Sequence, residues 1–231
     1  MNTILQELTE KYPDLNGCRE DIGKAFEAMK RSFENKGKLL LAGNGGSASD
    51  CEHVMGELMK GFVSKRPVPS SMREKLMKQE DEEGNYLADH LQGALPAISL
   101  VSQTSLMTAF ANDVAADMIF AQQVYGYGQP GDVLAVFSTS GNSVNVVRAV
   151  QVAKTLGLVT IGFSGRDGGR LKELCDIAIL VPYDRTHDIQ ERHLPVYHAI
   201  CLMLEETFFS HENCTWRNRH RRNEMRGGSR F

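Results

Sequence analysis

The sequence has no long apolar run and little net charge. No stretch approaches the roughly eighteen consecutive apolar residues of a membrane-spanning helix, and 26 basic residues against 29 acidic ones leave a net charge of −3. The first fifteen residues lack the basic and apolar segments of a signal peptide, and no repeat of solenoid period is present. We therefore expect a cytoplasmic protein with no membrane contact, and nothing in the composition favours nucleic-acid binding.

Cysteine is also sparse. The chain has five cysteines, an odd number, and none of them forms a C-x-x-C pair. They are Cys18, Cys51, Cys175, Cys201 and Cys214. This pattern is typical of reduced thiols in a cytosolic protein and excludes a disulfide-stapled fold.

What the sequence does contain is an alternation of short apolar runs and helical patterns. The expected strands cover residues 38–42, 97–101, 133–137, 159–163 and 177–181. The main helical patterns cover residues 2–12, 16–36, 47–61, 105–125, 144–156 and 188–209. Such alternation predicts an α/β fold with a five-stranded parallel sheet flanked by helices, connected by right-handed crossovers in the doubly wound manner.

Three segments fall outside this alternation. The N-terminal helices, residues 2–36, precede the first strand and carry one apolar stripe, which could pack on another subunit, on the chain's own sheet, or on both. The stripe consists of Ile22, Ala25, Phe26, Met29 and Phe33. Residues 68–94 are polar and long for a loop, so we expect an insertion with short helices at 73–79 and 86–91. The basic tail, residues 211–231, is expected to be a poorly ordered, solvated terminus.

A glycine-rich turn follows the first expected strand. Asn44, Gly45, Gly46 and Ser47 stand between the strand and a helix. Glycines allow backbone N–H groups to approach a ligand closely, and a helix N-terminus favours an anion. Ser47 could cap the helix or bind phosphate oxygens. Taken alone, the segment could equally be a tight strand-to-helix turn.

A second loop of small polar residues follows the third expected strand. It contains Ser138, Thr139, Ser140 and Ser143. The hydroxyls lie just past the carboxyl end of a strand, where open α/β sheets bind ligands. Two uncharged, hydroxyl-rich loops after two strands favour one shared oxyanion ligand, such as a sugar phosphate.

Two helices carry residues capable of acid–base chemistry. His53 and Glu57 are four residues apart and share one helix face, which suits a surface contact, two metal ligands or an acid and a base. Gln190 and His198 lie broadly on one side of the last helix. A histidine in such an apolar helix could also be a core residue, and Pro195 should bend the helix or delay its start.

The ordered set of these motifs resembles the sugar isomerase (SIS) domain. G-N-G-G-S, H-x-x-x-E, N-D, S-T-S-G-N-S and I-Q-E with a histidine eight residues after the glutamine occur in the order and spacing of the phosphoheptose isomerase family. The likeness covers about residues 1–210 as one SIS domain, apart from the insertion. It implies a flavodoxin-like doubly wound fold and isomerisation of sedoheptulose 7-phosphate to D-glycero-D-manno-heptose 7-phosphate.

The resemblance also implies roles for individual residues. Glu57 and His198 match the family's catalytic base and acid, and Asn112 with Asp113 matches its Asn-Asp pair. The substrate-binding positions fall on Asn44, Gly45, Gly46, Ser47, Glu57, Asn112, Asp113, Ser138, Thr139, Ser140, Ser143 and Gln190. The positions used by zinc-holding members fall on His53, Glu57, Gln190 and His198. Where many relatives have an arginine after the glutamate, we expect Lys60 or a later basic residue.

The family likeness further implies one zinc per subunit and a homotetramer with sites at subunit interfaces. Two other functions remain open. One is a non-catalytic SIS protein that senses a phosphosugar or associates with a replication initiator; the presence of both Glu57 and His198 favours the enzyme. The other is an isomerase of a different phosphosugar, because the sequence does not fix the length of the sugar.

Overall fold

The computed structural model describes residues 3–79 and 83–209. The sheet has five parallel strands in the order β2-β1-β3-β4-β5, which confirms the predicted fold class. The strands are β1 (Leu39–Gly43), β2 (Ala97–Ser99), β3 (Val133–Phe137), β4 (Val159–Ser164) and β5 (Ile177–Leu180). The predicted tail, residues 211–231, lies outside the described part of the chain.

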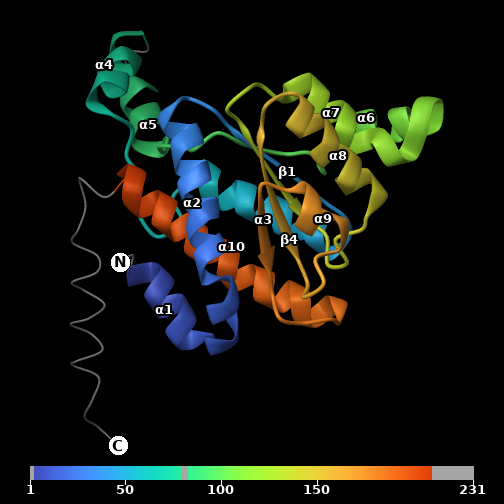
Figure 1. The fold of residues 1–231 in the computed structure, drawn as a ribbon. Coiled ribbons are helices and arrows are strands. Elements are labelled where there is room, and N and C mark those ends of the chain that lie inside the picture. Colours follow the sequence, from blue (N-terminus) through green and yellow to red (C-terminus); the bar gives the residue numbers. More distant parts are fainter. Residues whose placement is uncertain (1–2, 80–82, 210–231) are drawn as a thin grey trace, which may run out of the picture.

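Helices cover both faces of the sheet, as Figure 1 shows. Those on one face are α1 (Thr3–Lys11), α2 (Arg19–Glu34), α3 (Gly46–Met59) and α10 (Thr186–Phe209). Those on the other are α7 (Ile119–Tyr127), α8 (Val144–Thr155) and α9 (Gly169–Leu174). Alternate residues of β1 serve the two layers: Leu39 and Leu41 face the first, and Leu40 and Ala42 the second. No described helix has the length and apolar character needed to span a bilayer.

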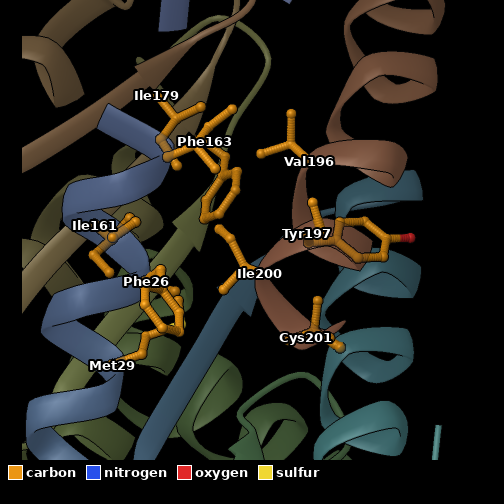
Figure 2. Close-up of a cluster of buried hydrophobic side chains, with 14 of the residues drawn as sticks. Phe26, Met29, Ile161, Phe163, Ile179, Val196, Tyr197, Ile200 and Cys201 are labelled. Atoms are coloured by element: carbon orange, nitrogen blue, oxygen red, sulfur yellow. The ribbon is translucent and has the colours of Figure 1, made fainter. Parts of the chain in front are cut away.

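The N-terminal stripe lies within the core of its own chain. Ile22, Ala25, Phe26 and Met29 are buried, and Figure 2 shows Phe26 and Met29 of α2 in one cluster with side chains of β4, β5 and α10. A 3₁₀ turn, Pro13–Cys18, joins α1 to α2. The stripe therefore covers the chain's own sheet, and it offers no free apolar face for assembly.

The insertion folds as a helical hairpin. It consists of α4 (Ser70–Gln79) and α5 (Glu83–His90), both longer than the helices predicted from the sequence. A β-bridge between Pro67 and Gln92 closes its base. In Figure 1 the hairpin stands clear of the sheet near the end of α10. It is an addition to the α/β body and contributes little to the core.

The single helix predicted for residues 105–125 is wrong. The structure has α6 (Thr104–Phe110), a π-helical turn at Ala111–Ala115, a 3₁₀ turn at Ala116–Met118 and then α7. None of the first three elements buries a residue, whereas α7 buries Phe120 and Val124. Regular α-helix resumes at α7, where the apolar side chains reach the core.

The last helix begins two residues before the predicted start and continues through Pro195. Proline removes one backbone donor and leaves the carbonyl four residues earlier, at Glu191, without its usual partner. Glu191 and Leu194 are exposed, so water can reach that carbonyl. Pro195 therefore neither delays the helix nor separates Gln190 from His198.

Candidate active site at the carboxyl ends of β1 and β3

Two loops lie side by side where β1 pairs with β3. The paired residues run from Leu39 opposite Val133 to Gly43 opposite Phe137, so the two strands end together. In this strand order the point between β1 and β3 is the topological switch point, where doubly wound proteins bind ligands. The side chains of Asn44 and Asn145 join the loops through two amide hydrogen bonds of 3.0 Å each.

The glycine loop places the N-terminus of α3 at this edge. Gly45 has φ of +57° and ψ of −124°, a backbone conformation open to glycine and strained for other residues. A Cβ atom on Gly46 would lie 2.6 Å from Nε2 of Gln190, so the absence of a side chain lets that amide rest on the loop. Ser47 is buried in the first turn of α3.

The serine loop has two hydroxyls turned toward each other and one open to solvent. Oγ of Ser138 lies 3.0 Å from Oγ of Ser143, and Ser138 is buried. Ser140 is exposed, and its Oγ accepts a hydrogen bond of 3.2 Å from the N–H of Asn142. Thr139 is half-buried between them. The loop ends at the N-terminus of α8, so its hydroxyls and the helix dipole favour the same anion.

His53, Glu57 and His198 come together where α3 packs on α10. Nε2 of His53 lies 3.3 Å from Oε1 of Glu57 and 3.4 Å from Nε2 of His198. Lys60 directly follows the last residue of α3, and its Nζ lies 3.3 Å from Oε2 of Glu57. The i,i+4 pair of α3 and the histidine of α10 thus form one cluster, here called the His–Glu cluster.

The cluster brings acceptor atoms together with few donors. Burial, reinforced by the neighbouring His53, lowers the pKa of His198, which favours its neutral form. The lone pairs of two ring nitrogens and a carboxylate oxygen at these distances repel one another unless a proton or a cation lies between them. The arrangement is therefore suited to handling a proton or holding a metal ion.

The distances fit a metal in part. Ligands at roughly 2.0–2.1 Å from a tetrahedral zinc lie about 3.3–3.4 Å apart, and the two contacts of His53 have this length. Nevertheless, no three His, Cys, Asp or Glu side chains within residues 3–79 and 83–209 are already arranged as a metal site. The donor types and the two distances from His53 fit zinc, whereas a complete coordination shell requires the side chains to move.

Tyr197 connects this cluster to a half-buried carboxylate, that of Asp50. Its hydroxyl donates to Oδ1 of Asp50 at 3.2 Å and lies 3.0 Å from Nδ1 of His53. Figure 2 shows the ring among the core residues, with its oxygen directed away from them. Burial raises the pKa of both Tyr197 and Asp50. With Tyr197 donating to Asp50, His53 places its proton on Nδ1 and leaves Nε2 free to face Glu57 and His198.

Not every residue expected at the site reaches it within one chain. Asn112 and Asp113 lie exposed on the π-helical turn, and Nδ2 of Asn112 donates to Oδ1 of Asp113 at 2.8 Å. Among the described residues they make no hydrogen bond to the two loops or to the His–Glu cluster. The exposed pair is available to a second molecule rather than to its own loops.

Sequence reasoning did not identify Asn145, Asp50 or Tyr197. Asp50 precedes His53 by three residues on the same helix, so helical spacing could have indicated that they share a face. Tyr197 directly precedes His198, and its hydroxyl is a polar group in an apolar stretch. Asn145 carries no comparable signal, because its partner lies 101 residues away.

We predict that Tyr197→Phe changes the tautomer of His53. In the native protein the proton should reside on Nδ1, because the tyrosine oxygen is its acceptor; without that oxygen, the Nε2–H form should become populated. Long-range ¹H–¹⁵N NMR of the histidine rings measures this. Tyr183→Phe is the control, since the Tyr183 hydroxyl donates to another carboxylate, Asp14, at 2.9 Å. A native His53 already protonated on Nε2 would contradict the prediction.

Comparison with known proteins agrees with this geometry. The SIS domain family matches residues 84–165. A phosphoheptose isomerase from a Nitratiruptor species is 42% identical over 79% of this chain and 82% of its own length. One from Rhodospirillum rubrum is 37% identical over 91% and 98%, respectively. A solved phosphoheptose isomerase from Francisella tularensis has 31% identity and a TM-score of 0.71, covering 85% of this chain and 91% of that one. The chain belongs to the phosphoheptose isomerase family of SIS-domain proteins.

Proposed function

We propose that this protein is an aldose–ketose isomerase that interconverts sedoheptulose 7-phosphate and D-glycero-D-manno-heptose 7-phosphate, for the biosynthesis of heptose-containing surface polysaccharides. The main observation behind this proposal is that Glu57 and His198 both contact His53. Glu57 lies on α3, which begins at the glycine loop, and His198 lies on α10, which packs against α3. The identity with relatives named phosphoheptose isomerase supports the same reaction.

The residue types at the site can perform this isomerisation. Glu57 takes a proton from C1 of the ketose, which gives an enediol, and returns a proton to C2 to form the aldose. His198 moves the proton between the oxygens on C1 and C2. C1 and C2 are adjacent in the sugar. Glu57 and His198 are also close to each other, because each contacts Nε2 of His53.

The phosphate is held at the other end of α3. We expect Ser140 and Thr139, with Ser138 and Ser143 behind them, to donate hydroxyl groups to the phosphate beside the N-termini of α3 and α8. Asn44, Gly45, Gly46 and Ser47 close the other side. A rise of 1.5 Å per residue puts Glu57 about 16 Å along α3 from Gly46. Helix side chains tilt toward the N-terminus, so the carboxylate of Glu57 would meet the carbonyl end of the sugar between these two points.

Zinc is the proposed cofactor, one per subunit. His53, Glu57 and His198 would hold it; the amide of Gln190, the expected fourth ligand, rests against Gly46 in this chain and would have to turn away from the glycine loop to reach the ion. Bound there, zinc would stabilise negative charge on the oxygens of the enediol. The convergence of three unshared electron pairs within 3.3–3.4 Å supports a cation at this point.

The proposed assembly is a homotetramer with active sites at subunit interfaces. Support comes from the segment that carries Asn112 and Asp113, which has no buried residue in its own chain. Leu106 and Val114 of this segment are exposed by 39% and 66%, and Tyr125 of the following helix α7 is exposed by 68%. Burial of these side chains against a second copy would remove apolar surface from water and bring Asn112 and Asp113 to a neighbouring site.

We also propose that the protein acts in the cytoplasm. Cys18, Cys51, Cys175 and Cys201 are free thiols. Burial raises the pKa of each, so they remain protonated and unreactive. Such thiols suit a reducing compartment, and fractionation of the source cells tests this location.

We predict that Glu57→Gln lowers kcat for sedoheptulose 7-phosphate by about a thousandfold, because it removes the base and keeps the shape. The assay measures aldose formation from ketose phosphates of five, six and seven carbons. Glu52→Gln is the control on the same helix, since Glu52 contacts Ser102 instead of the cluster. A preference for a shorter sugar would change the assigned substrate. Native protein inert toward all of them would favour a phosphosugar-binding regulator.

Metal content tests the zinc site. We expect dialysed native protein to retain about one zinc per chain by mass spectrometry of the elements, and His53→Ala to lose most of it. His90→Ala is the control, because His90 is an exposed histidine on α5. Equal zinc content in native protein and His53→Ala would refute this ligand set, and so would a native protein that takes up no added zinc.

Light scattering tests the assembly. The native protein should have a mass near four times the 25.7 kDa of one chain. Val114→Asp should shift it to smaller species, because a charge would be buried at the proposed interface. Val63→Asp, at a valine exposed by 56%, is the control and should not change the mass. A native mass near 25.7 kDa would refute the tetramer.

A further inference from the structure

A fully buried ion pair lies directly behind the His–Glu cluster. Nε of Arg66 lies 2.7 Å from Oε1 of Glu205, and the two residues are only 1% and 3% exposed. A buried pair loses the hydration of both charges, so its net effect on stability is often small. Its other hydrogen bonds show what else the pair does.

Arg66 caps the helix that carries Glu57. Its Nη1 donates to the carbonyl of Leu58 at 2.8 Å, and its Nη2 donates to the carbonyl of Glu57 itself at 3.0 Å. These carbonyls belong to the last turn of α3, where no later helical N–H can reach them. The guanidinium thus fixes the backbone of Glu57 directly.

Glu205 fixes the turn that follows the same helix. Its two carboxylate oxygens accept hydrogen bonds from the backbone N–H groups of Phe62 at 2.8 Å, Val63 at 3.0 Å and Ser64 at 3.2 Å. Glu205 follows His198 by seven residues on α10, about two turns, so both lie on nearly the same face. The pair therefore ties the end of α3 to the face of α10 that carries His198.

The backbone of Arg66 is held in a strained conformation. Its φ is +44°, in the left-handed region that residues other than glycine rarely occupy. Such strain persists only where the surroundings enforce it, and it is concentrated at functional sites. Here the carbonyl of Arg66 accepts from the N–H of Gly93 at 2.7 Å, next to the Pro67–Gln92 bridge. The base of the α4–α5 hairpin thus enforces the conformation of Arg66.

We propose that the Arg66–Glu205 pair positions Glu57 for proton transfer. By holding the carbonyl of Glu57 and the turn after α3 against α10, the pair sets where the carboxylate lies relative to His198. Neither Arg66 nor Glu205 touches the substrate, so they are positioning residues. This inference rests on the proposed function, in which Glu57 is the base.

A second ion pair, in which the carboxylate is buried and the lysine is partly exposed, provides a control. Nζ of Lys38 lies 2.6 Å from Oδ2 of Asp132, which is 2% exposed. Like Glu205, Asp132 also accepts backbone N–H groups, those of Lys38 and Gln129. This pair precedes β1 and β3, at the opposite edge of the sheet from the two loops. Asp132→Asn should therefore cost stability without disturbing the site.

The experiment compares Glu205→Gln, Arg66→Lys and Asp132→Asn in the full-length protein. Each is assayed with sedoheptulose 7-phosphate at a temperature well below its Tm. We expect Glu205→Gln and Arg66→Lys to lower kcat at least tenfold while KM changes less than twofold. Asp132→Asn should lower Tm comparably and leave kcat and KM within twofold of native. Such a split between kcat and KM is the mark of a displaced catalytic group.

Three results would overturn the positioning role. One is a kcat per folded protein that matches that of Asp132→Asn. Another is a rise of KM that accounts for the whole fall of kcat/KM. The third is failure of both Glu205→Gln and Arg66→Lys to fold, which would make the pair a stability element. Glu57→Gln is measured beside them. If Glu57→Gln retains native kcat, Glu57 is not the base and the positioning role fails with it. If Glu57→Gln is inactive, the kcat and KM of Glu205→Gln and Arg66→Lys decide whether the pair positions Glu57.

Discussion

The parallel pairing of β1 with β3 is the constraint on which the site depends. Register places Gly43 opposite Phe137, so both strands end at the same level. The helices that follow these strands lie on opposite faces of the sheet, which makes this the position where doubly wound proteins bind ligands. Asn44 and Asn145 then lock the loops through paired amide hydrogen bonds. We propose that the substrate phosphate binds at this edge, because two helix N-termini and several hydroxyls meet here.

The packing of α3 on α10 supplies the second half of the site. It brings His53, Glu57 and His198 to contact although they come from distant parts of the chain. Tyr197 orients the cluster from one side, through His53 and Asp50. The buried Arg66–Glu205 pair lies on the other side and holds the end of α3. The proposed catalytic groups thus lie on two helices rather than on loops, which fixes their separation.

Much of this could be predicted from local patterns. Apolar runs located all five strands, and the i,i+4 spacing placed His53 and Glu57 on one face. What the sequence did not reveal depends on tertiary contacts. The π-helical turn at 111–115 buries no residue, and no local pattern in the sequence distinguishes it from a continuous helix. Arg66 looks like one of several surface cations in a polar stretch, and its partner Glu205 is 139 residues away. The sequence shows the apolar stripe of α2, but it does not show which surface the stripe covers.

The central claim is that one carboxylate on α3 moves a proton between adjacent carbons of a phosphosugar. The most direct measurement is NMR of the aldose formed from sedoheptulose 7-phosphate in D₂O. A proton carried on Glu57 exchanges with solvent during the lifetime of the enediol, so deuterium should appear at C2 of the product. Isomerisation with no deuterium at C2 under slow turnover would indicate direct hydride transfer between the carbons. That result would contradict the account.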